Sequence, residues 1–267
     1  MTTAVDTALY LACVAPRGTL AGFDHAGIED NGPRARTIAA AGYDAIVVDV
    51  APRDFDAKRT EDIDWLAPRA SRHEAIVRAA NERADIMPLG FGGVFSTEET
   101  LAQTLADKRV EIDEFLDDAK GCDEWSLKAV VDRESAIERA RTRLAMQKTA
   151  DEGHAYLVRR KLDAEAEAAA EELVIDRVSE MIEAMGETVV AALERPVIDT
   201  EEDNGRWTVA HVALLVPRDL LPQFDEALDT HGGALDDDHI DLELTGPWAP
   251  YSFVPAFGDE DNSNDDC

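Results

Sequence analysis

Two stretches in the first half of the chain carry residues of the kinds that enzymes use. His73-Glu74 places a base beside a carboxylate in an amphipathic stretch. A zinc-protease helix needs a second histidine four positions after the first, and Val77 stands there, so a packed histidine explains the pair better. Gly90–Gly93 is too short for a dinucleotide fingerprint and lacks the lysine of a phosphate-binding loop. Close packing of backbones accounts for those glycines.

The other two candidate stretches are acidic and lie near the end of the chain. His231 and His239 flank Asp236–Asp238, a set that could hold a metal ion but is typical of a solvated loop in an acidic protein. Asp259–Asp261 begins like a calcium loop, yet Asn264 stands where that loop requires glycine, and the chain ends before the twelfth position. No Gly-x-Ser-x-Gly motif of a hydrolase occurs. We therefore predict a protein that is not an enzyme, with no catalytic residue, no metal site and no cofactor.

The net charge of the chain limits which partners it can bind and indicates the salt content of its surroundings. Lys and Arg number 26 against 57 Asp and Glu, a net charge of −31, while 45% of the residues are hydrophobic. An acidic, lysine-poor surface on an ordinary core is typical of a salt-rich cytoplasm, where screening weakens self-repulsion, and predicts a halophilic archaeal source. Nucleic acid needs a basic footprint, so it is excluded as a partner.

Neither a membrane span nor a signal peptide is expected, because no stretch has the required apolar length or order. The cysteines Cys13, Cys122 and Cys267 are odd in number and far apart, which favours a reducing cytoplasm over a disulfide scaffold.

The first part of the chain predicts a mixed α+β domain over residues 1–121. Apolar runs indicate strands at 8–14, 37–41 and 43–50. A helical pattern over 61–84 is interrupted by Pro68, which predicts two helices with a joint there. Residues 86–95 are apolar and glycine-rich, as in a strand or extended hairpin. A helix from 96 or 97 to 121 completes the domain.

The second part, residues 122–257, predicts a ferredoxin-like domain. A strand over 125–131 is followed by a long helical stretch over 133–195, hinged near Gly153 and ended by Pro196. Two hairpin strands at 197–200 and 207–216, a helix at 219–230 and a strand at 239–245 that Gly246-Pro247 stops complete it. The order β-α-β-β-α-β is that of the split βαβ plan. Residues 258–267 can bury nothing and predict a disordered acidic tail.

The segment after Pro247 carries an unusual apolar load for a chain end. Trp248, Tyr251 and Phe253 are separated by prolines, which favour an extended path. The segment is either a hook for a partner or a latch on the protein itself. We favour a latch that crosses back to Met87–Phe95 and ties the two domains together, since free rings would promote aggregation.

Three stretches resemble the gas vesicle L/F accessory protein family (GvpL/GvpF). They are Met87–Phe95 (MPLGFGGVF), Glu124–Lys128 (EWSLK) and Leu244–Val254 (LTGPWAPYSFV), and the last is the most specific. His73 also matches, and the resemblance covers roughly residues 8 to 254. The chain departs from the family at Leu89-Gly90, where Met-Arg is usual, and at Ala249, where Pro is usual.

The resemblance implies two α+β domains, the second a modified ferredoxin-like fold, and the chain's length favours the L-type over the F-type. It implies a non-enzymatic accessory or minor structural protein that binds the small hydrophobic shell protein and other accessory proteins, in the cytoplasm and on the gas vesicle, to assist nucleation or assembly. The candidate structural or partner-contact residues are Phe91, Phe95, Trp125, Trp248, Tyr251 and Phe253.

Two other functions stay open from the sequence. Ferredoxin-like domains often bind ligands between helices and sheet, so a small-molecule-sensing regulatory module is the alternative, by analogy of fold alone. A hydrolase or metal enzyme is the third, and no motif supports it.

Overall fold

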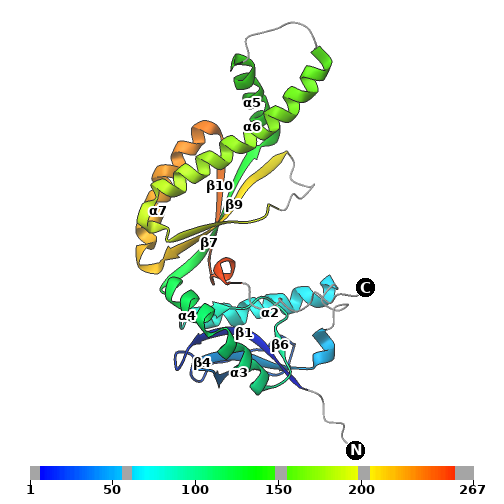
Figure 1. Cartoon of the computed structure of the whole chain (residues 1–267), viewed down its shortest axis with the longest axis vertical. Coiled ribbons are helices and arrows are strands. Elements are labelled where there is room, and N and C mark those ends of the chain that lie inside the picture. Colours follow the sequence, from blue (N-terminus) through cyan, green and yellow to red (C-terminus); the bar gives the residue numbers. More distant parts are fainter. Residues whose placement is uncertain (1–6, 56–61, 148–154, 198–204, 256–267) are drawn as a thin grey trace, which may run out of the picture. The chain divides into compact units, whose positions relative to one another are not determined.

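The computed structural model describes residues 7–55, 62–147, 155–197 and 205–255. The chain divides into two compact units (Figure 1). Unit 1 comprises Met1–Cys122 together with Trp248–Cys267, and unit 2 comprises Asp123–Pro247.

Unit 1 is built on an antiparallel sheet whose central strand is β1 (Ala8–Pro16). Residues 8–15 are all buried, which confirms the central strand predicted from the apolar run. The strand order is β2-β3-β4-β1-β5, and β6 also pairs with β1. The other strands are β2 (Asp24–His25), β3 (Ala35–Ala40), β4 (Tyr43–Val50), β5 (Met87–Pro88) and β6 (Val94–Phe95).

The glycine-rich stretch between β5 and β6 borders β1, as its composition predicts. The amide of Leu89 donates to the Ala12 carbonyl at 2.9 Å, and the amide of Leu11 donates to the Gly93 carbonyl at 2.9 Å. Gly92 has φ 114°, a conformation that disfavours other residues. The backbone of this stretch therefore extends the sheet for only two residues at a time.

The helices of unit 1 correct two predictions. Helix α2 (Ile63–Asn81) runs unbroken through Pro68, so the predicted joint is wrong. Pro68 lies near the helix start, and the packing of Ile76, Val77 and Ala80 in the core with β1 offsets the backbone hydrogen bond that it removes. The single helix predicted over 96–121 is two helices that meet at Lys108.

These two helices are α3 (Glu98–Asp107) and α4 (Arg109–Asp118), and a short 3-10 turn η1 (Pro52–Phe55) precedes α2. Thr97 caps α3, accepting from the amide of Thr100 at 3.1 Å.

Unit 2 has a four-stranded sheet in the order β10-β7-β9-β8, with helices on one of its faces (Figure 1). Its core contains Ala166, Ala170, Val174 and Val178 of α6, spaced by four residues as one face of a helix requires. In chain order the elements are β7 (Cys122–Asp132), α5 (Arg133–Gln147), α6 (Ala155–Ala184), η2 (Gly186–Thr188), β8 (Ala191–Glu194), β9 (Arg206–Pro217), η3 (Arg218–Leu220), α7 (Leu221–Gly232), η4 (Gly233–Asp238) and β10 (Asp241–Trp248).

Two expectations for unit 2 are wrong. The helix predicted to reach Arg195 ends at Ala184, and Ala191–Glu194 within that stretch forms the edge strand β8. The strand predicted over 197–200 falls almost wholly in residues 198–204, which lie outside the described residues, as does the predicted hinge at Gly153. Strand β10 continues through Gly246-Pro247, which was expected to stop it. Because β10 lies at an edge of the sheet, a proline without an N–H is tolerated there.

The closing segment, residues 248–255, differs from its predicted place in a domain over 122–257. Ala249 is buried in the core of unit 1 and Tyr251 packs against that core, because both meet apolar residues of β1 and α2. The boundary between the units therefore falls at Pro247 on this side. The predicted disordered tail, 258–267, lies outside the described residues.

Within the described ranges, no helix is both long enough and apolar enough to cross a membrane.

Candidate functional site

The six residues predicted for structural or partner contacts are divided between the units. Trp248, in unit 1, is the most exposed of them, with 39% of its surface accessible. Phe95 pairs with Leu9 across β6 and β1, and Phe253 is half-buried in η5 (Tyr251–Phe253). Phe91 and Tyr251 come together in unit 1, whereas Trp125 is partly buried and packs against the core of unit 2.

Trp125 packs inside unit 2 and explains the glycine in β10. Its ring lies 5.9 Å from that of Phe224, centroid to centroid. A Cβ on Gly246 would lie 2.9 Å from Trp125 Cε3, and Gly246 has φ 151°. Only glycine fits both the space and the backbone conformation. Trp125 therefore packs against the core of unit 2 and limits residue 246 to glycine.

Phe91 and Tyr251 belong to an aromatic group that surrounds one buried histidine. We call it the His73 cluster. His73 is 5% exposed, and its ring meets those of Tyr10 and Phe91 edge-on at 5.6 and 6.0 Å. The cluster comprises Tyr10, Phe55, Trp65, His73, Phe91 and Tyr251.

A chain of hydrogen bonds runs through the cluster. The Tyr10 hydroxyl lies 2.7 Å from His73 Nδ1, and the Tyr251 hydroxyl lies 3.2 Å from His73 Nε2. Tyr251 also bonds the Glu74 carboxylate, which can only accept. Tyr251 therefore donates to Glu74 and accepts from Nε2–H, which leaves Nδ1 to accept from Tyr10. The neutral tautomer with its proton on Nε2 suits both tyrosine hydroxyls.

Burial sets the ionisation of these groups. Desolvation lowers the pKa of His73 to about 4, a trend that the Leu89 carbonyl partly opposes. Desolvation raises the pKa of Glu74, and it raises the pKa values of Tyr10 and Tyr251. A buried imidazole with both nitrogens bonded is poorly placed to exchange protons with a substrate. The cluster holds the closing segment on unit 1.

The acidic candidates form no site in the described residues. Asp238 accepts from Arg177 Nε at 2.8 Å, which occupies one of the proposed ligands. Among the residues with described positions, no three His, Cys, Asp or Glu side chains gather closely enough to hold a metal ion. The calcium-like stretch at 259–261 lies outside the described ranges.

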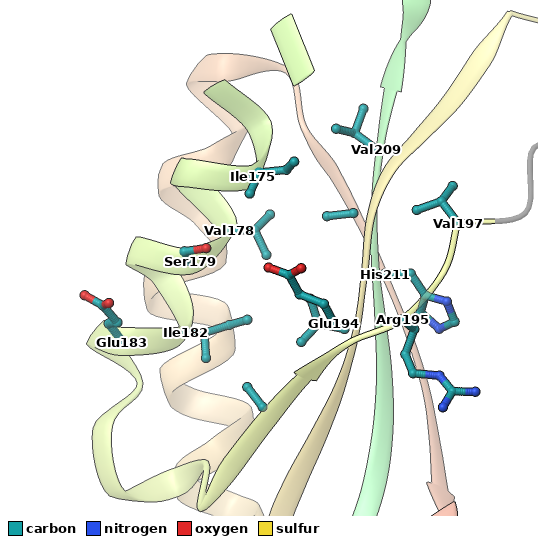
Figure 2. A pocket seen from close by; sticks show the side chains of 13 residues that line it. Ile175, Val178, Ser179, Ile182, Glu183, Glu194, Arg195, Val197, Val209 and His211 are labelled. Atoms are coloured by element: carbon teal, nitrogen blue, oxygen red, sulfur yellow. The ribbon is translucent and has the colours of Figure 1, made fainter. Parts of the chain in front are cut away.

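Unit 2 also has an uncovered apolar groove whose lining residues the sequence did not predict (Figure 2). It lies between α6 and the edge strand β8, and its volume is about 390 Å³. Two of its apolar lining residues, Ile175 and Val197, are 36% and 38% exposed. We call it the α6–β8 groove; its walls include Ile175, Val178, Ile182, Ala192, Glu194 and Val197.

Glu194, an exposed residue, adds a carboxylate to the lining of this apolar groove. Figure 2 shows its side chain directed toward α6, while the guanidinium of Arg195 is directed away. Glu194 makes no ion pair with a residue whose position is described. The groove escaped prediction because residues 189–194 were assigned to a helix. The available signal was Val189-Val190, two β-branched residues that follow Gly186 at φ 59°.

The chain is similar to known proteins of one family. The family model for gas vesicle synthesis protein GvpL/GvpF matches residues 8–255. Gas vesicle protein L of Streptomyces sp. (strain CB03234) is 29% identical over 216 residues, 79% of each chain. Gas vesicle protein L2 of Halobacterium salinarum is 26% identical over 86% of this chain and 84% of that relative.

A solved structure supports the same fold. The crystal structure of gas vesicle protein GvpF from Anabaena sp. PCC7120 matches with a TM-score of 0.69 at 16% identity, over 93% of this chain and 96% of that one. With the family model spanning both units, the chain belongs to the GvpL/GvpF family of gas vesicle synthesis proteins.

Proposed function

We propose that the protein is a non-enzymatic accessory or minor structural protein that binds the small hydrophobic shell protein of gas vesicles, together with other accessory proteins, in the cytoplasm and on the vesicle. Family membership gives it a role in gas vesicle formation. Binding would shield apolar surface of the shell protein before it polymerises, and a role in nucleation is equally compatible.

The observation that carries the proposal is the α6–β8 groove. The closing segment packs largely on unit 1, where the Tyr251 hydroxyl forms hydrogen bonds with His73 and Glu74. The groove instead leaves aliphatic side chains accessible, since Ile175 and Val197 of its lining are 36% and 38% exposed. Clustered exposed apolar side chains are typical of a protein-binding surface.

Co-purification tests the proposal. The shell protein, kept soluble as a fusion, should be retained by the immobilised full-length protein, and the fusion partner alone should not. Equal retention of both would contradict the proposed function.

The small-molecule-sensing alternative rests on the same groove, since about 390 Å³ between helix and sheet can also admit a ligand. A saturable thermal shift with a metabolite, without retention of the shell protein, would favour that alternative.

We also infer three finer points. Unit 2 has the ferredoxin-like plan, supported by the order β7, α5–α6, β8, β9, α7, β10 and by the strand order β10-β7-β9-β8. A halophilic source rests on the net charge of −31. The L-type rests on chain length alone. Sequence identity does not separate the two types, because the L and F relatives of Streptomyces match at 29% and 27%.

A further inference from the structure

We infer that the outer edge of β8 binds an extended segment of a partner protein, one whose side chains facing α6 are apolar and include a lysine or arginine opposite Glu194. The inference rests on the proposed function, in which that partner is the shell protein. It names the binding face and the chemistry of the bound segment.

Among the described residues, no strand pairs with the outer edge of β8. The sheet ends at β8 in the order β10-β7-β9-β8. Arg195 donates its amide to the His211 carbonyl of β9 at 2.7 Å. Because amides alternate between the two sides of an antiparallel strand, Leu193 also faces β9, whereas the amides of Ala192 and Glu194 point outward. Such an edge is a template for a further strand.

Both faces of an added strand would meet apolar side chains. Ala192 and Glu194 line the groove together with Val178 and Ile182 of α6, so side chains on that face would fill it. On the other side of the pleat, Leu193 is 42% exposed. Neither lysine nor proline, the usual guards of an edge, occurs within β8.

The negative charge of the groove favours a bound segment that carries a basic side chain. Glu194 projects into the apolar space and Glu183 stands on the α6 rim (Figure 2). Glu194 is exposed in the free protein, and a bound segment that covers the groove would shield its pairing with a basic side chain from salt. A second copy of the chain carries the same −31 charge, and Asp259–Asp261 of the chain's own end is acidic. Both are repelled from this site.

Three full-length variants test the inference against the soluble shell-protein fusion. Ala192→Pro replaces an outward amide, so it blocks strand addition without removing a β8–β9 hydrogen bond. Glu194→Lys reverses the charge in the groove. Glu226→Lys makes the same charge change on the exposed face of α7, away from the groove, and is the control. Circular dichroism and thermal melting establish that each variant is folded.

We expect Ala192→Pro and Glu194→Lys each to raise the Kd measured by biolayer interferometry roughly tenfold or more, while Glu226→Lys binds like the wild type. Wild-type affinity in either folded groove variant would overturn the inference and leave the proposed function standing.

If the wild type itself does not bind the shell protein, the proposed function fails, and a peptide decides the inference separately. The seven-residue peptide Thr-Val-Thr-Lys-Thr-Val-Thr, labelled with a dye, should bind the wild type more tightly than its counterpart with Glu at the centre. Ala192→Pro should abolish that binding. Equal anisotropy for both peptides on the wild type would overturn the inference.

Discussion

His73 joins three separate segments of unit 1 through its two ring nitrogens. Tyr10 comes from β1, His73 and Glu74 from α2, and Tyr251 from the closing segment. A buried imidazole can serve a hydroxyl donor on one nitrogen and a hydroxyl acceptor on the other only while it is neutral. The stability of this arrangement therefore depends on pH.

The pH dependence has a defined sign and window. The unfolded chain takes up a proton on His73 below its ordinary pKa of 6.5, whereas the native pKa is about 4. Between those values the unfolded state binds more protons, so native stability falls as the pH drops from 6.5 toward 4. We expect His73 to account for about 2 kcal/mol of lost unfolding free energy between pH 7 and pH 5.

Denaturant titrations at both pH values, in constant salt, measure this contribution. His73→Gln should be less stable at pH 7 and should lose less stability than the wild type on acidification. The control is His239→Asn, which removes an exposed histidine at φ 56°, a conformation that asparagine tolerates. An identical pH slope in His73→Gln and the wild type would show that His73 is not held neutral.

At the scale of elements, β10 and the closing segment form one continuous stretch that contributes to both units. Residues up to Pro247 complete the sheet of unit 2, and Ala249 and Tyr251 then complete the core of unit 1. This packing on unit 1 agrees with a segment that docks on the protein itself, while the predicted tie between the two domains stays a prediction. The same stretch leaves Trp248 39% exposed, so one of its rings stays accessible.

Truncation tests the contribution of the closing segment. A chain that ends after Pro247 loses the buried Ala249 and the Tyr251 ring, and it removes the Tyr251 hydroxyl from His73 Nε2 and from Glu74, while Tyr10 still bonds His73 Nδ1. We expect unit 1 to lose roughly 3–6 kcal/mol of unfolding free energy and to bind the dye ANS. The control is a chain that ends after Pro255, which keeps the segment and should melt like the full chain. Equal melting of both truncated chains would contradict the latch.

Much of the fold could be predicted from hydrophobic periodicity and from the positions of turn residues. The wrongly predicted elements share one cause. The central strand β1 and the strand β4 were predictable because both are apolar runs bounded by turn residues. Strand β8 was missed because Ala191-Ala192-Leu193-Glu194 has strong helix propensity, which pairing with β9 overrides. That pairing is a tertiary contact, so the sequence of residues 191–194 alone does not predict it.

The candidate site was predictable only in part for the same reason. The aromatic residues of the closing segment were identified from their types and spacing, but their partner His73 lies 178 positions earlier. The α6–β8 groove depends on where β8 begins, so an error of a few residues in that element concealed it.

At the scale of the whole molecule, the net charge of −31 is the dominant long-range term. Many arginines are already paired at the surface, as Arg34 is with Asp24 at 2.6 Å and Arg206 with Glu243 at 2.7 Å. Surface pairs of this kind contribute little each. The unpaired excess of carboxylates therefore repels, and added salt should relieve the repulsion.

We expect the melting temperature to rise steeply with KCl, since the Debye length falls from about 10 Å at 0.1 M to about 3 Å at 1 M. For a chain of this size each kcal/mol recovered corresponds to roughly 2–4 °C. Scanning fluorimetry from 0.1 to 3 M KCl measures the rise, and sucrose at matched osmolality is the control. A melting temperature that does not change with KCl would contradict the halophilic interpretation.

The division of unit 1 between the two ends of the chain has a consequence for biosynthesis. A ribosome that has released residues up to Cys122 must add roughly 125 more before it supplies Ala249 and Tyr251, on the order of ten seconds of translation. During that interval the nascent first unit exposes the surface that these residues later cover. A chaperone bound to the emerging chain would find its substrate there, and release would be timed by completion of the polypeptide.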